Sequence, residues 1–409
     1  MPVFGSQWFG ATDSTYEIDQ SIRFESGDDA RLSRSPGSSG SLTTWTLSCW
    51  VKRGRPNANE NGQWFPIWSA SDGSSTYDAP LYIGDASAPG PWNVSIAGQN
   101  WTTTQKAADV AAWYHTVVVW DSTDGTAGDR MRLYINGSRV TDFSATGTAT
   151  SSMESRWNSS SYSSHRIGSL NITGGADNKY LFDGYLAEMV FLDGTASTDA
   201  SDFGETKSTT GQWIPKDVSG LTFGTNGFYL KGESSSDLGN DSSGNNNDWS
   251  STNLATTDQM SDSPTGNHCT LNPLWVDQHT LSEGNLVASA AADSAAIGTM
   301  AFDVADSDGF YFEAKVTTAA TYPNVGIRTV ESPSQVGAAT SLSGNSTGRY
   351  SFTGSDGNFN DAGSSSSYGA AWAGTADKVI GVLVKAGALY FSIDGTIQNS
   401  GTAAKTGLT

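Results

Sequence analysis

The sequence contains few cysteine, histidine and basic residues. Its 409 residues include two Cys, four His, and 22 Lys and Arg against 42 Asp and Glu, which gives a net charge of −20. Nucleic acids and anionic membranes attract basic proteins, so neither is an expected partner. Disulfide scaffolds of small secreted domains are denser in cysteine. We therefore expect Cys49 and Cys269 to be unpaired thiols; a single bond between them is the alternative.

Long hydrophobic runs are also missing. No stretch approaches the roughly 18 apolar residues of a membrane-spanning helix, so no membrane insertion is expected. The N-terminus, MPVFGSQWFG, has neither the basic region nor the apolar core of a signal peptide. These absences predict a protein that is made in the cytoplasm of a host cell and reaches the outside by another route, such as assembly into a virus particle.

Polar uncharged and aromatic residues fill the place of the missing charges. Hydrophobic residues make up 36% of the chain and charged residues only 16%, with 46 Gly, 14 Trp, 14 Tyr and 16 Phe. This composition is typical of β-sandwiches with many tight turns, and it argues against a helical enzyme or a disordered chain.

Two hairpins mark two β-domains. In the stretch 131–143, MRLYINGSRVTDF, Asn136-Gly137 is a strong signal for a type I′ turn, because both central residues of that turn need positive φ. Asp394-Gly395 is the same signal in the stretch 388–397, ALYFSIDGTI. The two hairpins are far apart in the chain, which predicts two domains of related architecture.

Other strands follow from hydrophobic periodicity. The stretch 45–51 alternates as a half-buried strand does, whereas 113–120 is apolar on both faces, as in a strand covered on each side. The stretch 234–264 is rich in Ser and Asn and predicts a connector. The predicted fold class is all-β, with two antiparallel β-sandwich (jelly-roll) domains joined by a Ser/Asn-rich connector. The predicted parts are a lead segment (1–20), a first sandwich (21–233), a connector (234–270) and a second sandwich (271–409) with no visible last strand.

The N-terminal half resembles the LamG-like jelly roll of the concanavalin A-like lectin/glucanase superfamily. The segments that carry this resemblance span residues 20–195 in order: SIRFESGDDARLSRS, WTLSCWVKRG, WYHTVVVWD, RLYINGSRV, RIGSL and LFDGYLAEMVFLDG. The stretches GQWIPKDVSGLTFGTNGFYLK and GNDSSGNNNDW look like extensions found in LamG-type proteins of marine bacteriophages. GFYFEAKVT, NVGIR, SYGAAW, KVIGVLV and ALYFSIDG resemble a SPRY-type sandwich. The resemblance implies a fold and a binding role, but no particular ligand.

Relatives of the LamG type often hold calcium through Asp, Asn and backbone oxygens, the ligands that hard cations prefer. Calcium is therefore a candidate cofactor, and the alternative is a solvated Asx-rich turn. The first candidate loop contains Asp241, Asn245, Asn247 and Asp248. The second contains Asp121, Asp124 and Asp129.

Glycoside hydrolysis is a further activity of the same superfamily. A retaining glycosidase needs two carboxyl groups about 5–5.5 Å apart. The glucanase pattern Glu-x-Asp-x-x-Glu is missing, and Asp183, Glu188 and Asp193 are spaced by five, which puts neighbours on opposite faces of a strand. The histidines lack metal-ligand spacing, and His115 is expected to be a hydrogen-bonded strand residue. We therefore predict no catalytic residues.

Carbohydrate binding needs exposed aromatic rings beside polar side chains. The region 64–101 is crowded with such residues, and the predicted carbohydrate-binding residues are Trp64, Trp68, Tyr77, Trp92 and Trp101.

The sequence thus predicts a non-enzymatic bacteriophage virion protein, a tail-fibre or receptor-binding component that adsorbs to glycans of the host surface. It would lie at the virion surface, contact other virion proteins through its N-terminal segment, and form a homo-oligomer such as a trimer. The alternatives are a capsid decoration or head-fibre protein without a specific ligand, and a hydrolase of surface polysaccharides.

Overall fold

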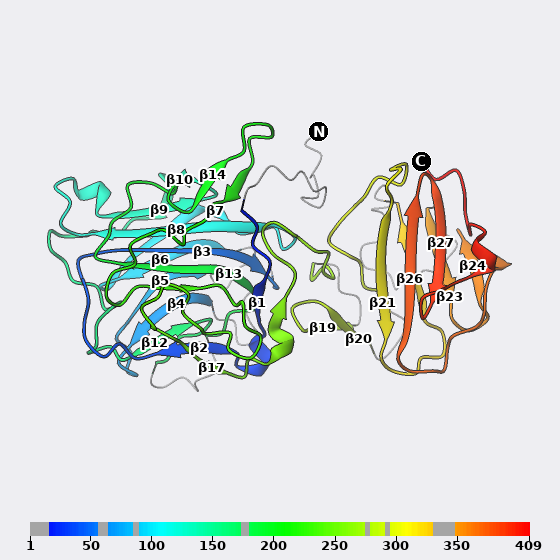
Figure 1. Cartoon of the computed structure of the whole chain (residues 1–409), viewed down its shortest axis with the longest axis horizontal. Helices are drawn as coiled ribbons and strands as arrows, with labels where there is room; N and C mark the ends of the chain where they lie inside the picture. The colour runs from blue at the N-terminus through cyan, green and yellow to red at the C-terminus, as the bar shows by residue number, and fades with distance from the viewer. Residues whose placement is uncertain are drawn as a thin grey trace. The chain divides into compact units, whose positions relative to one another are not determined.

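The computed structural model describes residues 16–55, 64–84, 90–172, 180–274, 279–290, 295–329 and 348–409. The chain forms two compact units: unit 1 comprises Met1–Leu274 and Leu281–Val287, and unit 2 comprises Trp275–Thr280 and Ala288–Thr409. Strands dominate both units, and the helical elements are short 3-10 turns (Figure 1). These turns are Ser26–Asp28, Ala127–Asp129, Thr256–Asp258 and Asn399–Gly401. Within the described ranges, no helix has the length and apolarity that a membrane crossing requires.

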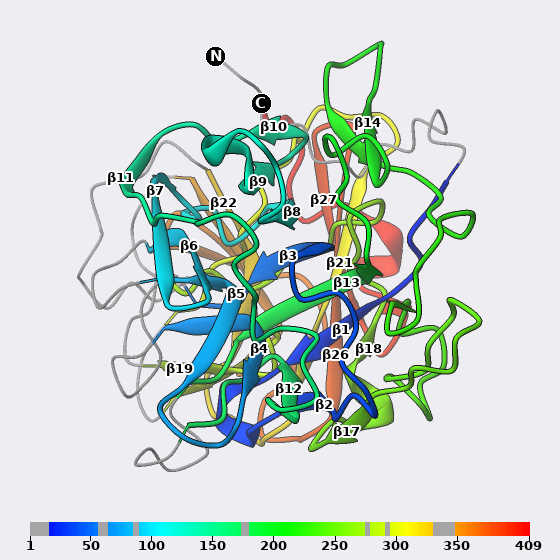
Figure 2. The same ribbon diagram turned by 90° about the vertical axis from the view of Figure 1, so that its left-hand side faces the viewer.

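Unit 1 is a sandwich of two antiparallel sheets (Figure 2). Sheet A runs in the order β10 (Ser138–Arg139), β9 (Met131–Ile135), β8 (Trp113–Asp121), β3 (Thr44–Arg53), β13 (Gly184–Asp193), β1 (Ser21–Phe24) and β18 (Gln259–Met260), and β16 (Phe228–Leu230) also pairs with β13. Sheet B runs in the order β11 (Phe143–Ala145), β7 (Gln99–Lys106), β6 (Pro91–Ile96), β5 (Tyr77–Ile83), β4 (Phe65–Ser71), β12 (Ser164–Ile167), β2 (Arg31–Arg34) and β17 (Ser250–Thr252). The predicted all-β jelly-roll class is confirmed.

The core lies between the two sheets. Leu47 and Val51 of β3 face it from sheet A, and Ile67 and Ile83 face it from sheet B, each at most 1% exposed. Alternation along an antiparallel strand places such residues on one face. The strand β3 lies where its periodicity predicted it, but the prediction that it is half-buried is wrong, because every residue from Trp45 to Arg53 is buried.

The outer face of sheet A is also covered. Val117 and Val119 of β8 point away from the main core and pack with Phe203 and Val218. Part of this covering layer is the hairpin of β14 (Gly204–Thr206) and β15 (Trp213–Pro215). A strand covered on both faces is apolar on both faces, which explains the apolar stretch 113–120.

The Ser/Asn-rich segment predicted as a connector is part of unit 1. β17 pairs with β2 and β18 pairs with β1, so this segment adds a strand to each sheet. Trp249 is 2% exposed and lies in the main core. Asp258 and Asp262 form ion pairs with Arg23 and Lys52, at 2.7 Å in both cases. The chain passes from unit 1 to unit 2 near residues 275–288 instead.

Unit 2 is a second, smaller sandwich. One sheet contains β21 (Phe310–Val316), β26 (Lys378–Lys385), β27 (Ala388–Ile393) and β28 (Thr396–Ile397). The other contains β22 (Asn324–Arg328), β23 (Arg349–Thr353), β24 (Asn358–Asp361) and β25 (Ser364–Ser367). A separate pair is formed by β19 (His279–Ser282) and β20 (Val287–Ala290), of which Leu281–Val287 are counted in unit 1. Phe352 and Phe391 join the two sheets in one core, which also contains Leu408. A short strand, β28, does follow the Asp394-Gly395 turn and pairs with β27.

Cys49 and Cys269 form no disulfide with each other. Cys49 is buried on β3, and Cys269 is exposed. Burial raises the pKa of the Cys49 thiol to about 12, so this side chain stays neutral and acts as a small apolar residue.

Candidate functional site: a surface aromatic cluster

Four aromatic rings meet on the outer face of sheet B. The ring centroid of Trp64 lies 5.9 Å from that of Tyr77, 4.4 Å from that of Tyr82 and 4.8 Å from that of Tyr180. All four side chains are partly exposed. We call these four residues the aromatic cluster.

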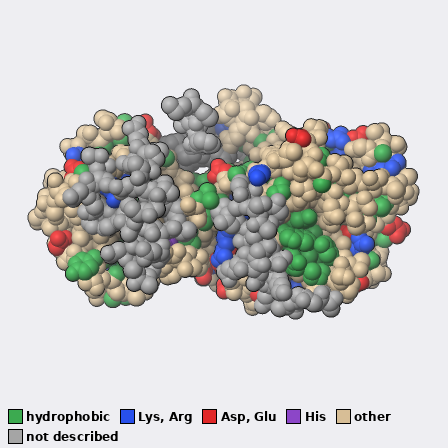
Figure 3. Space-filling view, turned by 180° about the vertical axis from the view of Figure 1, so that it is seen from behind, with side chains coloured by type: hydrophobic (Ala, Val, Ile, Leu, Met, Phe, Trp, Pro, Cys, Tyr) green, Lys and Arg blue, Asp and Glu red, His purple; other side chains and the backbone are tan. Residues whose placement is uncertain are grey.

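Strand register explains why the cluster faces outward. Phe65 of β4 pairs with Ile83 of β5, and both are buried in the core. The next pair, Pro66 and Tyr82, points to the other face. Viewed from behind, unit 1 carries a patch of hydrophobic side chains (Figure 3).

A segment distant in sequence brings Tyr180 to this face. The hydroxyls of Ser69 and Ser71 on β4 donate hydrogen bonds to the backbone oxygens of Ser169 and Asn171. The backbone N–H of Leu170 in turn donates a hydrogen bond to the backbone oxygen of Tyr180 at 3.1 Å. Two outward serines of β4 therefore hold the backbone that places the fourth ring.

The cluster is uncharged but retains polar groups. Burial, and then the neighbouring Tyr77, raise the pKa of Tyr82 to about 12. Burial and the nearby Tyr180 also raise the pKa of Tyr77. The hydroxyls thus stay protonated at neutral pH and can donate hydrogen bonds. Asp72 follows Ser71, the register partner of Tyr77, and is an exposed acceptor beside the cluster.

The prediction of a carbohydrate contact is wrong for three of the five aromatic residues. Trp68, Trp92 and Trp101 are 1%, 0% and 4% exposed, so no ligand can stack on them. Trp68 turns inward because the register of β4 shifts between Pro66 and Trp68, which breaks the alternation that would put it beside Trp64. Trp64 and Tyr77 are the two predicted residues that the structure does bring together.

The acidic loop predicted as a calcium site is internally hydrogen bonded. Oδ1 of Asp241 accepts from the backbone N–H of Tyr229, and Oδ2 accepts from that of Asn247, at 2.9 and 2.8 Å. The side-chain amides of Asn245 and Asn247 donate to the backbone oxygen of Gly227. Asp248 accepts from the backbone N–H of Asp241. These contacts give the loop the form of an Asx-rich turn, and calcium binding there stays a prediction.

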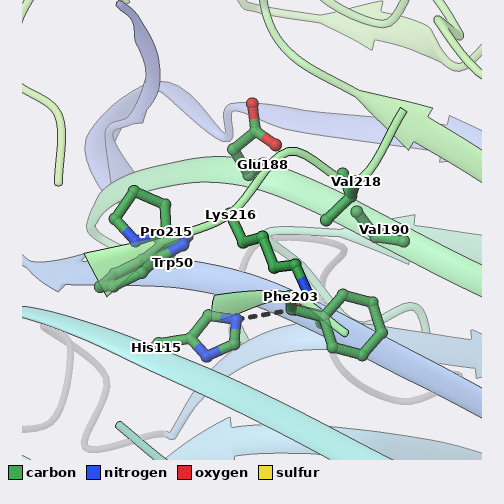
Figure 4. A pocket seen from close by; sticks show the side chains of 9 residues that line it. Trp50, His115, Glu188, Val190, Phe203, Pro215, Lys216 and Val218 are labelled. Atoms are coloured by element: carbon green, nitrogen blue, oxygen red, sulfur yellow. Dashed lines mark hydrogen bonds between the residues drawn. The ribbon is translucent and has the colours of Figure 1, made fainter. Parts of the chain in front are cut away.

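A small hollow on the outer face of sheet A is lined by Ser48 and His115, and Figure 4 shows His115 among the other lining side chains. Ser48 Oγ lies 2.9 Å from Nε2 of His115, and Nε1 of Trp213 donates to Nδ1 of His115 at 3.0 Å. Burial lowers the pKa of His115 to about 3, so the ring is neutral. Since Nδ1 accepts, Nε2 carries the proton and donates to Ser48. The pair has the opposite polarity to a serine nucleophile and its base, and His115 is a hydrogen-bonded strand residue as predicted.

The three carboxylates considered for hydrolysis lie apart. Asp183 directly precedes β13, and Asp193 is its last residue. At roughly 3.3 Å per strand residue, the two are about 30 Å apart. Asp183 contacts Ser26 and Arg55, whereas Asp193 accepts from the backbone N–H of Ser41. Glu188 lies between them, 7% exposed. No two of these side chains have the spacing that a retaining glycosidase needs.

Comparison with known proteins agrees with the fold of unit 1. Residues 25–200 match the family model described as the concanavalin A-like lectin/glucanases superfamily. No curated protein sequence matches the chain.

Among solved structures, a native heptameric SAP-like pentraxin from Limulus polyphemus is 17% identical with a TM-score of 0.29, over 44% of this chain and 78% of that chain. The CBM40 of the Ruminococcus gnavus IT-sialidase, bound to α2,3-sialyllactose, is 12% identical with a TM-score of 0.28, over 44% and 91%. Domains LG4-5 of the mouse laminin α1 chain are 9% identical with a TM-score of 0.32, over 96% and 80%.

Proposed function

We propose that the chain binds carbohydrate through the aromatic cluster of unit 1. The observation that carries this proposal is the set of four partly exposed rings around Trp64. Aromatic faces are apolar and carry partial negative charge, so they suit the C–H face of a sugar ring, while phenol hydroxyls and Asp72 suit its hydroxyls. The match of residues 25–200 to a lectin/glucanase superfamily supports the same class of ligand.

The finer proposal is a non-enzymatic component of a bacteriophage virion that adsorbs to glycans of the host surface. Its support is the surface-like composition, the net charge of −20, and the resemblance of residues 211–231 and 239–249 to extensions of phage LamG-type proteins. A strongly acidic protein is repelled by anionic polymers, so a neutral glycan is the proposed ligand. Attachment through the N-terminal segment and assembly into a homo-oligomer belong to this proposal; residues 1–15 lie outside the described part of the chain.

A glycan array tests the proposal. We expect the protein to bind a defined microbial surface glycan, and Trp64→Ala to weaken that binding roughly thirtyfold, because a covered aromatic side chain contributes about 2 kcal/mol. The measurement is calorimetric titration with the glycan that the array identifies.

Trp64→Phe keeps an aromatic face and should retain most of the affinity. Tyr322→Ala, which removes a 73% exposed ring from unit 2, should leave it unchanged. If the wild type and Trp64→Ala bind with equal affinity, the aromatic cluster is not the binding site. If reducing sugar is released from the bound glycan, the protein is a hydrolase.

A further inference from the structure

Glu188 occupies an unusual backbone position. The pairing of β13 with β3 shifts register between Ala187 and Val190, and Glu188 has a φ of +49°. A β-bulge of this kind redirects a side chain out of the regular alternation. Here it places a carboxyl group on the covered outer face of sheet A, where it is 7% exposed.

Three oxygen groups from distant parts of the chain form a closed ring there. The hydroxyl of Tyr16 lies 2.9 Å from Oε1 of Glu188 and 2.7 Å from the hydroxyl of Tyr229. The hydroxyl of Tyr229 is in turn hydrogen bonded to Oε2 of Glu188. The ring therefore joins the N-terminal segment, the bulge of β13 and strand β16.

Proton counting shows what the ring requires. Each of the three contacts needs one proton between its two oxygens, and the two phenols supply only two. With an ionised Glu188, both phenols would donate to the carboxylate, and their own oxygens would face each other at 2.7 Å without a proton. With a neutral Glu188, each of the three groups donates once and accepts once. The observed geometry therefore calls for a third proton, on the carboxyl group.

The ring holds a short segment that we call the strap, residues 16–20. Ile18 is 3% exposed and packs with Trp50 and Ala187. The backbone N–H of Ile18 donates to Oγ1 of Thr265 at 3.0 Å. Tyr16 is the point where the strap meets the ring.

We propose that the neutral carboxyl group of Glu188 holds the strap in place at Tyr16. As the pH rises, the carboxyl group ionises and the strap detaches from it. The neighbouring charges leave this role intact. Lys231 lowers and Asp217 raises the pKa of Glu188, so the two act in opposite directions. Lys216 lines the adjacent hollow and donates to the backbone oxygen of Ser201. His115, with a pKa lowered by burial to about 3, stays neutral throughout.

The direction of the pH effect follows from burial. Desolvation, the largest cause, raises the pKa of Glu188 from 4.5 to about 7, against the lowering effect of the two phenols. A raised carboxyl pKa means that the stabilisation is complete below about pH 4.5 and is lost as the pH rises towards and through 7. The pKa values of Tyr16 and Tyr229 are raised as well, chiefly by burial, so both phenols keep their protons across this range.

Hydrogen exchange of the strap in the full chain tests the proposal. We compare the wild type with Glu188→Gln at about pH 6 and about pH 8.5, with exposure times scaled to the intrinsic exchange rate. Above the pKa, each pH unit shifts a proton-requiring state about tenfold, so strap protection in the wild type should fall about tenfold or more. The Gln amide can donate in place of the third proton, and its strap should stay equally protected at both pH values.

Two further measurements complete the test. Infrared difference spectra of the wild type against Glu188→Gln should contain the carbonyl band of a neutral carboxylic acid at about pH 6 and lose it by about pH 8.5. Tyr16→Phe removes one hydroxyl from the hydrogen-bonded ring but keeps the aromatic carbons. The strap amides of this variant should exchange faster than those of the wild type at about pH 6. Equal pH profiles for the wild type and Glu188→Gln, or the lack of a Glu188-dependent carboxylic acid band, would overturn the proposal.

Discussion

Lys52→Met is expected to lower the stability of unit 1 by about 3–5 kcal/mol, the usual cost of removing one partner of a buried ion pair. The side chain of Lys52 is fully buried, and its ammonium group donates to Oδ2 of Asp262, to Oδ1 of Asn267 and to the backbone oxygen of His268, at 2.7–2.8 Å. Methionine fills a similar volume but leaves the carboxylate of Asp262 without its counterion. Denaturant unfolding followed by tryptophan fluorescence measures this loss, because Trp275 and Trp372 are the only tryptophans after residue 274.

A matched control uses the same substitution at an exposed pair. Lys231 lies 3.1 Å from Glu233, with side chains 35% and 65% exposed. Exposed pairs contribute about 0–1 kcal/mol, so Lys231→Met should change the stability little. If Lys52→Met is as mild as Lys231→Met, Asp262 does not hold residues 255–270 onto sheet A in the way described above.

Trp249→Ala is expected to cost about 3–5 kcal/mol, as large aromatic truncations in a core do. The ring of Trp249 lies 5.1 Å from that of Phe228 and 6.5 Å from that of Trp157, measured between centroids. Its backbone N–H donates to the backbone oxygen of Gly239 at 2.9 Å. The same unfolding measurement reports the loss.

This prediction separates the two interpretations of the Ser/Asn-rich segment. In a connector, Trp249 would be solvated and its truncation would change the stability by no more than about 0.5 kcal/mol. Tyr322→Ala provides that reference, since its ring is 73% exposed. If Trp249→Ala lowers the stability no more than Tyr322→Ala does, residues 234–270 are a linker and not part of unit 1.

The turns and strands that could be predicted from the sequence are those recognisable from their own residues. Asn136 and Gly137 have φ of +48° and +76°, as a type I′ turn requires, and Asp394 and Gly395 repeat the turn with +49° and +77°. The alternation of residues 45–51 likewise predicted the strand observed at residues 44–53, although not the layer that covers its outer face. These features are local, and local pattern is what a single sequence displays.

The Ser/Asn-rich segment was wrongly predicted to be a connector, because the prediction used its composition and the sequence does not show which distant residues it contacts. Its low hydrophobicity is typical of a linker. Its attachments are two short strands, the buried Trp249, and the pairs of Asp258 and Asp262 with Arg23 and Lys52 more than 200 positions earlier. No periodicity within the segment reports a contact with so distant a partner.

The aromatic cluster could be predicted only in part for the same reason. Trp64 and Tyr77 stand out by residue type in a polar region, and the structure brings them together. Trp68 was misassigned because a β-bulge changes the face on which every later residue of a strand lies. Tyr180 arrives from more than 100 positions away, held by serines of β4, and no local signal identifies it.

The most direct test of the account is to observe which tryptophans a bound glycan touches. The 14 indole N–H signals are recorded by nuclear magnetic resonance during titration with the glycan from the array, and the signal of Trp64 is assigned from Trp64→Phe. The Trp64 signal is expected to shift in proportion to occupancy, while those of the buried Trp68, Trp92 and Trp101 stay in place. A glycan that saturates the protein and leaves the Trp64 signal unmoved would contradict carbohydrate binding at the aromatic cluster.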